Sequence, residues 1–296
     1  MRFLPPAAFV AVLGGICVSA GDAWEVSTGF LIGPRYDSHL FYVKPEKSAA
    51  WQKSYQAAPY RKEAQGRLLG VKLNGLDDPV ASLKENGFNF ARLELQTGEW
   101  SLFTAAGGLD LESLPQFSRL MEETARAGIA VELVLFSPAR DQDFESPEAI
   151  LDSARSLTDW LIDGNYRHVL LNPAHHWHSP GWDFDHFVPQ SLERIATVIR
   201  ERFRDRRTDF ALPIALSAPM NSELNRSLVE QSDVLVAAGQ GPQVNPRSVD
   251  RPILVEHESP QACAAMFARF AGCIVSRPQA GEALAPLGSL VLKALK

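Results

Sequence analysis

Apolar runs of five to eight residues alternate with helical stretches along the chain from about residue 67 onward. Short apolar runs bounded by Gly, Pro, Asn or Asp are typical of buried strands, whereas apolar residues spaced at i, i+3 and i+4 indicate helices. This pattern predicts eight strands, at residues 67–73, 88–96, 129–137, 167–175, 210–219, 232–240, 253–259 and 273–278.

Helices are predicted between these strands, at residues 77–87, 111–128, 147–163, 188–206, 221–230, 260–270 and 281–296. The helix at 188–206 has the clearest apolar stripe, made of Leu192, Ile195, Ile199 and Phe203. Ser146 is placed as the N-cap of the helix at 147–163. Strands that alternate with helices predict the α/β class and a (β/α)8 TIM barrel over residues 67–296, with no second domain.

The first 66 residues follow a different pattern. Residues 1–20 carry one positive charge, an apolar core and small residues at the end, which outlines a secretory signal peptide cleaved after Ala20 or Ala23. Residues 21–66 are rich in aromatic side chains and have no helical period, so we expect an N-terminal extension packed on the barrel. The protein is therefore expected to be secreted or periplasmic, with no membrane partner after cleavage.

The net charge and the cysteines bear on the possible partners and on a possible disulfide. The formal net charge is −6, and a mildly acidic chain argues against a nucleic-acid partner, which requires a basic face. Cys263 and Cys273 remain after signal cleavage, on a predicted helix and the strand that follows it. Whether they form a disulfide stays open, because the two Cα atoms would have to lie within about 7 Å.

Polar and aromatic residues gather where the predicted strands end, and the active sites of (β/α)8 barrels lie at these carboxyl ends. Residues 168–186 alone hold five of the seven histidines. The candidates are Arg92, Glu94 and Trp100 near the second strand, His175, His176, Trp177, His178 and Trp182 near the fourth, Ser217 near the fifth, and Glu256, His257 and Glu258 near the seventh.

Four strand motifs resemble those of cellulase-like retaining glycoside hydrolases, of family five and its clan. The motifs are ENGFNFARLEL, ARAGIAVELVLF, YRHVLLNPAHHW and RPILVEHESP, and the resemblance covers roughly residues 68–278. It implies a barrel that acts on or binds a polysaccharide, with carbohydrate as its substrate or ligand. Arg92 matches the Arg that ends the family's second strand. We expect no cofactor.

Both catalytic carboxylates of the family fall on histidines in this chain. The family's Asn-Glu pair on the fourth strand, whose Glu is the acid/base, falls on His175-His176. Its nucleophile, commonly the fifth residue after a Pro, falls on His257. Retaining glycosidases need two carboxyl groups about 5 Å apart, and histidine transfers protons near neutral pH but does not readily replace a carboxylate nucleophile.

Glu256 and Glu258 flank His257 and share one face of the strand, because side chains alternate. If the protein is active, we expect Glu258 or Glu256 as the carboxylate and His176 as the proton donor. The predicted substrate-binding residues are Arg92, His175, Glu94, Trp177, Trp182 and Trp100. The tryptophans are expected either to stack on sugar rings or to belong to the core.

Two other functions stay open. Loss of the Asn-Glu pair suits a catalytically inactive relative that binds carbohydrate or a protein partner through the same site. A metal-dependent hydrolase is the second alternative, in which His176 and His178 would bind the metal with His257 and with Glu258 or Asp185. No metal ligand is assigned, because such enzymes usually place a His-x-His pair on the first strand. For His168, His178 and His186, hydrogen-bonded packing is the simpler expectation.

Overall fold

The computed structural model describes residues 68–72, 80–81, 83, 90–97, 100–138, 140–175, 177, 182, 189–208, 210–218, 231–238, 253–257 and 272–275. The predicted signal peptide, the N-terminal extension, Cys263 and the helices at 221–230, 260–270 and 281–296 lie outside the described residues. Of the predicted helix at 77–87, residues 80, 81 and 83 are described and are helical.

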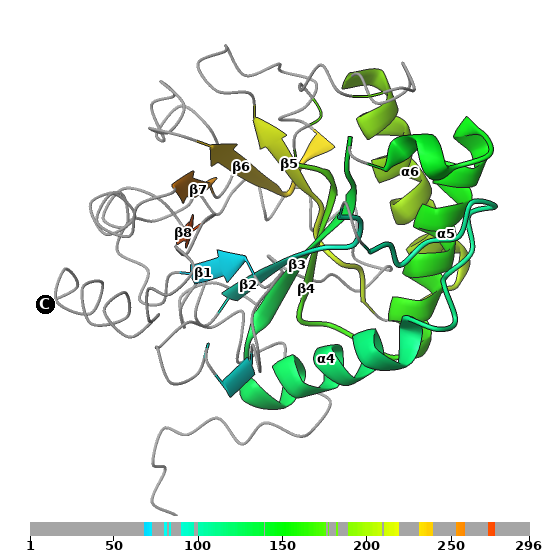
Figure 1. Ribbon diagram of the computed structural model, residues 1–296. Coiled ribbons are helices and arrows are strands. Elements are labelled where there is room, and N and C mark those ends of the chain that lie inside the picture. Colours follow the sequence, from blue (N-terminus) through cyan, green and yellow to red (C-terminus); the bar gives the residue numbers. More distant parts are fainter. Residues whose placement is uncertain are drawn as a thin grey trace, which may run out of the picture.

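Eight described strands form one parallel sheet in the order β4-β3-β2-β1-β8-β7-β6-β5 (Figure 1). The strands are β1 (Leu68–Lys72), β2 (Phe90–Glu94), β3 (Ala130–Phe136), β4 (Val169–Ala174), β5 (Ala215–Ala218), β6 (Val234–Ala238), β7 (Ile253–His257) and β8 (Gly272–Val275). Leu171 of β4 makes a parallel bridge to Ile214, just before β5, so the two edge strands of the sheet are linked. The prediction of eight parallel strands in chain order is confirmed.

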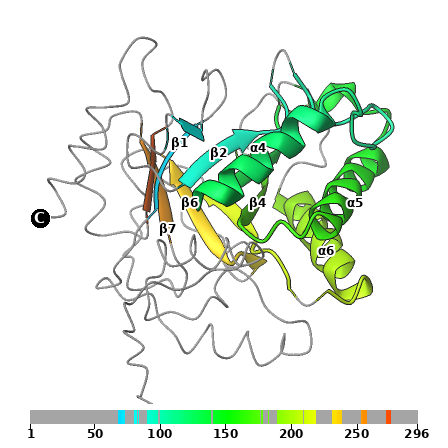
Figure 2. The same ribbon diagram turned by 90° about the horizontal axis from the view of Figure 1, so that it is seen from below.

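Three long helices cover the strands on one side (Figures 1 and 2). They are α4 (Leu114–Ala127), α5 (Pro147–Asp163) and α6 (Pro189–Asp205), with a short 3-10 helix, η3 (Asp141–Asp143), before α5. The Ser146 side chain accepts a hydrogen bond from the backbone N of Ala149 at 3.2 Å, so its predicted capping role is confirmed. Pro147 follows as the first helical residue, where a missing N–H costs nothing.

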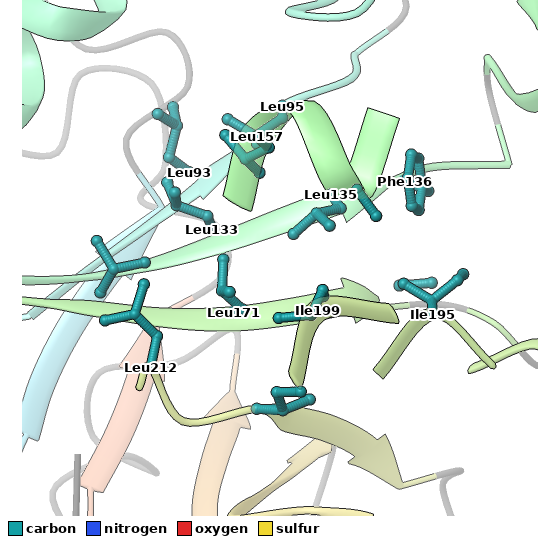
Figure 3. Packing of buried hydrophobic residues seen from close by; sticks show 14 of the residues in the cluster. Leu93, Leu95, Leu133, Leu135, Phe136, Leu157, Leu171, Ile195, Ile199 and Leu212 are labelled. Carbon is teal, nitrogen blue, oxygen red and sulfur yellow. The ribbon is translucent and has the colours of Figure 1, made fainter. Parts of the chain in front are cut away.

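Alternate residues along each strand face two different surroundings. One face, which we call the outer face, packs against the helices through Leu133, Leu135 and Leu171. Figure 3 shows these side chains beside those of the helices, among them Leu157, Ile195 and Ile199. The predicted stripe of α6 is confirmed, since each of its four residues is at most 2% exposed. The opposite face of the sheet, which we call the inner face, carries Phe90, Leu170 and Leu254, all buried, and the polar residues described below.

Two local features differ from the sequence analysis. The fifth strand begins at Ala215 and not at residue 210, since Pro213 has no N–H to donate to a strand ladder. The Pro213 carbonyl instead accepts a hydrogen bond from Leu171 N at 3.0 Å. After β2 the chain forms two antiparallel bridges that were not predicted, Gln96 with Ser101 and Phe103 with Leu109.

In the part of the chain that the structure describes, no helix has both the length and the apolar character needed to cross a membrane.

His168 lies in the core beneath β4, with 2% of its surface exposed. Its Nε2 is 3.1 Å from the Thr124 hydroxyl, and its ring meets Tyr166 edge-on. Burial lowers the pKa of His168 from 6.5 to about 4. This histidine therefore packs and hydrogen-bonds in the core, as expected.

We expect the free energy of unfolding to fall as the pH decreases from 6.5 to 4, because in that range the unfolded state protonates His168 and the folded state does not. The contribution is about 3 kcal/mol. His168→Gln, which does not titrate, should remove this part of the pH dependence in urea unfolding at pH 7 and pH 4. Thr124→Val, which keeps the histidine, should retain it. An unchanged pH dependence in His168→Gln would contradict the assignment.

Ser146→Ala should lower the free energy of unfolding by about 1 kcal/mol, because the first turn of α5 loses its cap. Ser118→Ala is the matched control, since the Ser118 hydroxyl bonds the Leu114 carbonyl within α4 and caps nothing. That control should stay within about 0.5 kcal/mol of the unmodified protein. Equal losses for the two variants in urea unfolding would contradict the capping role.

Candidate functional site

Six polar side chains on the inner face, toward the carboxyl ends of the strands, join in a closed cycle of hydrogen bonds. We call this cycle the polar ring; it consists of Arg92 (β2), Glu132 (β3), Asn172 (β4), His175 (directly after β4), Ser217 (β5) and Glu256 (β7). Each of the six is at most 8% exposed. The ring thus connects strands that are far apart in sequence.

Arg92 contacts three other members of the polar ring and is 1% exposed. Its Nε donates to Glu132 Oε2 at 2.8 Å, and its NH1 donates to Glu256 Oε2 at 2.6 Å. Parallel pairing of β2 with β3 sets Arg92 directly beside Glu132. Burial lowers the pKa of Arg92, but the two carboxylates outweigh burial and raise that pKa above its ordinary value. The guanidinium is therefore a permanent positive charge between two acids.

His175 connects the Arg92–Glu256 pair to β5. Its Nε2 lies 2.5 Å from Glu256 Oε2 and 3.1 Å from Arg92 NH1, and its Nδ1 lies 2.9 Å from the Ser217 hydroxyl. An arginine nitrogen only donates, so Nε2 cannot satisfy both neighbours. The shorter contact assigns the Nε2 proton to the carboxylate. Glu256 Oε2 then accepts from both Arg92 and His175.

Asn172 closes the ring on its other side. Its Nδ2 donates to Glu132 Oε1 at 2.7 Å and to the Ser217 hydroxyl at 3.2 Å. Because Ser217 accepts from Asn172, its own proton is available to His175 Nδ1. That direction agrees with Nε2 of His175 being the donor to Glu256. One consistent set of donors and acceptors therefore runs around the ring.

Glu256 is ionised in this environment. Burial alone would raise its pKa, but the charge of Arg92 and the hydrogen bonds from Arg92 and His175 bring it well below its usual range. The side chain keeps about a tenth of its surface exposed. An ionised, partly accessible carboxylate can act as a nucleophile or stabilise positive charge on a ligand, and it cannot donate a proton.

The structure brings together four of the candidates from the sequence analysis, namely Arg92, His175, Ser217 and Glu256. Glu94 ends β2 two residues beyond Arg92, so alternation puts it on the inner face, where it is partly exposed. It is the next acidic position beyond Arg92 toward the carboxyl end of β2.

The three predicted tryptophans are partly buried and pack against the hydrophobic core. Trp177 donates from Nε1 to the backbone carbonyl of Ser217 at 2.6 Å, which holds it next to the polar ring. Trp100 donates from Nε1 to the Ser113 hydroxyl at 3.0 Å, and Ser113 belongs to the turn before α4. Trp177 is therefore hydrogen-bonded to a residue of the polar ring, and Trp100 is hydrogen-bonded to the turn before α4.

Several predicted residues lie outside the described residues, namely His176, His178, Asp185, Glu258 and the side chain of His257. The predicted proton donor and one of the two candidate carboxylates therefore stay predictions. Among the residues that are described, no three His, Cys, Asp or Glu side chains are grouped so as to hold a metal ion.

Sequence reasoning missed two members of the polar ring, Glu132 and Asn172. Both interrupt otherwise apolar strands, in AVELVLF and VLLNPA. A charged residue in the middle of a fully buried strand requires a partner, and Arg92 in the neighbouring strand was the available cation. This signal could have been read from the sequence.

No protein-family model matches the chain, and no curated protein matches it. Solved structures do match. Mannanase BCman from Bacillus subtilis is 9% identical, with a TM-score of 0.52, over 78% of this chain and 86% of its own. The endo-β-1,4-glucanase Xac0029 from Xanthomonas axonopodis pv. citri is 12% identical, with a TM-score of 0.49, over 76% and 99% of the two chains.

A GH30 endoxylanase from Clostridium papyrosolvens C71 is 12% identical, with a TM-score of 0.45, over 70% of this chain and 64% of its own. The chain spans less than two thirds of that endoxylanase, and 44% of another matching chain from Bacteroides vulgatus. The protein shares its fold with the Bacillus subtilis mannanase, and at 9% identity the likeness concerns the fold alone.

Proposed function

We propose that this chain is a glycoside-hydrolase-like protein that acts on or binds a polysaccharide at the carboxyl ends of its strands. The observation that carries the proposal is the ionised Glu256, held by Arg92 and His175 near the end of β7. A fixed carboxylate of this kind is what the positively charged, oxocarbenium-like transition state of glycoside cleavage requires. The fold shared with a mannanase supports the same class.

The proposal includes a closed (β/α)8 barrel. The bridge between Leu171 and Ile214 supports closure, because it links the two strands at opposite edges of the sheet. The polar ring supports it too, since Arg92 contacts Glu256 although β1 and β8 lie between their strands in the sheet order. Contacts of this kind arise when a sheet curls so that inner-face side chains meet.

Of the two carboxylates that the sequence left open, we favour Glu256 over Glu258. The support is its pairing with Arg92, the residue that matches the arginine of the family's second strand. We propose His176 as the proton donor. Glu94, also near the strand ends, is the alternative donor. Glu132 is excluded from direct contact with a sugar, because none of its surface is exposed.

A catalytically inactive, carbohydrate-binding protein is the second candidate function. Retaining hydrolysis needs a second carboxyl group as acid/base about 5 Å from the first. The other carboxylate of the polar ring is the inaccessible Glu132, which favours binding without cleavage. In either case we propose that the protein is secreted or periplasmic, on the evidence of the pattern in residues 1–20.

Glu256→Gln should reduce hydrolysis of aryl β-glycosides by at least about a thousandfold while polysaccharide binding persists, if Glu256 is the reacting carboxylate. The panel contains aryl glucosides, mannosides and xylosides, and binding is measured by affinity electrophoresis. Glu112→Gln, on the exposed turn before α4, is the control and should be fully active. Binding without hydrolysis in the unmodified protein would establish the second function. If the unmodified protein neither binds nor hydrolyses any of these carbohydrates, the proposal is refuted.

Arg92→Met should lower the free energy of unfolding at pH 7 by about 3–5 kcal/mol, because it leaves buried carboxylates without their cation. Unopposed burial then raises the pKa of Glu256, so the folded variant gains a proton more readily than the unfolded chain. The deficit should therefore shrink as the pH falls from 7 to 4. Urea unfolding at both pH values measures it.

The exposed Arg126 of α4 provides the matched control. Arg126→Met should stay within about 0.5 kcal/mol of the unmodified protein at both pH values. A pH-independent deficit for Arg92→Met would mean that the loss reflects packing and not the pairing of charges.

A further inference from the structure

Glu132 is a charged side chain with no exposed surface, and the proposed chemistry does not use it directly. It lies in the middle of β3, and both of its oxygens accept hydrogen bonds. Oε2 accepts from Arg92 Nε at 2.8 Å, and Oε1 accepts from Asn172 Nδ2 at 2.7 Å. Glu132 is therefore linked to Glu256 through Arg92.

Glu132 is one of two counter-charges of Arg92, but a buried ion pair is by itself weak evidence for a stabilising role. Taking an ion out of water costs several kcal/mol even when it is paired, and apolar residues of similar volume often serve as well or better. Of the residues beside Glu132 on the inner face, Ala130, Val134 and Leu170 are apolar and fully or almost fully buried, whereas Arg92 and Asn172 are polar. An apolar residue at 132 would suit the first three and would leave Glu256 as the counter-charge of Arg92.

The geometry of Arg92 gives Glu132 a different role. A guanidinium is planar and rigid, so fixing one edge determines where the opposite nitrogen points. Glu132 fixes Nε, and NH1 on the other side is then directed at Glu256 Oε2 at 2.6 Å. Without the contact at Nε, the Arg92 side chain could adopt other rotamers, and these would place NH1 elsewhere.

We propose that Glu132 is a positioning residue for the carboxylate of Glu256, which it holds in place through Arg92. The consequence for a sugar substrate rests on the proposed function, whereas the placement of Glu256 by Glu132 does not.

Charge and position predict opposite effects on Glu256. Among the residues that the structure describes, the charged and titratable groups in contact with Glu256 are Arg92 and His175. Suppose that Glu132 acts only through its negative charge. Neutralising Glu132 would then leave Glu256 as the one carboxylate of the ring that pairs with Arg92, and the pKa of Glu256 would stay low or fall further. If Glu132 acts by position, displacing its carboxylate should move NH1 away, and the pKa should rise toward the ordinary value.

Two conservative variants separate these effects. Glu132→Asp keeps the charge but withdraws the carboxylate by one methylene group from Arg92 Nε. Glu132→Gln removes the charge but keeps an oxygen that can accept from Nε at the same reach. Leu133→Ala, at the adjacent outer-face position, is the stability control, because it opens a cavity in the core without touching the polar ring.

The pKa of Glu256 is followed by NMR on protein with ¹³C-labelled glutamate side chains, with its signal identified by its loss in Glu256→Gln. We expect no titration above pH 4.5 in the unmodified protein, in Glu132→Gln or in Leu133→Ala. In Glu132→Asp the pKa should rise toward its ordinary value, so that the titration extends above pH 4.5. On any glycoside that the protein cleaves, kcat should fall about tenfold to a hundredfold in Glu132→Asp with KM nearly unchanged.

An unchanged Glu256 titration in Glu132→Asp would overturn the proposal, as would a rise in Glu132→Gln equal to that in Glu132→Asp. A loss of kcat in Leu133→Ala as large as in Glu132→Asp would assign the effect to stability and overturn it as well. If the unmodified protein cleaves no glycoside, the proposed enzymatic function fails, and the titration still decides whether Glu132 positions Glu256.

Discussion

A buried guanidinium must have its charge matched, and this requirement at Arg92 shapes the centre of the sheet. Arg92 is 1% exposed, and it is matched by Glu132 from β3 and Glu256 from β7. Two acids around one cation then need further donors, which Asn172 and His175 supply. The composition of the polar ring follows, residue by residue, from the presence of one buried positive charge.

The ring is not what makes the protein stable. Arg92 NH2 and Asn172 Oδ1 are buried with no hydrogen-bond partner among the described residues, and each such atom costs about 1–3 kcal/mol. The outer face offsets this cost, because there Leu133 and Leu171 pack into a continuous apolar core with the helices. Alternation along each strand thus separates the two tasks, with stability on one face and polar chemistry on the other.

Much of this arrangement could be predicted from the sequence, because it depends on local patterns. The bounds of α5 and its Ser146 cap follow from local hydrogen bonding and spacing, and Arg92, His175 and Glu256 were candidates because strand ends meet at one edge of a parallel sheet. Register is not local. Counting along the seventh strand could not say that Glu256 meets Arg92, since that contact depends on how sheet curvature brings β7 opposite β2. Glu132 was not among the candidates, because these were taken from the ends of the strands and Glu132 lies in the middle of β3.

The direction of the hydrogen bonds limits what the polar ring can do chemically. Glu256 Oε2 accepts hydrogen bonds from two nitrogens, and both oxygens of Glu132 accept hydrogen bonds as well. Both carboxyl groups of the ring are therefore carboxylates that act as acceptors. Such a set can place negative charge against a positively charged transition state, but no carboxyl proton is left to give to a leaving group. Cleavage of a glycoside by this chain would therefore require an acid from outside the ring, at the ends of the strands, and without that acid the proposed function reduces to binding.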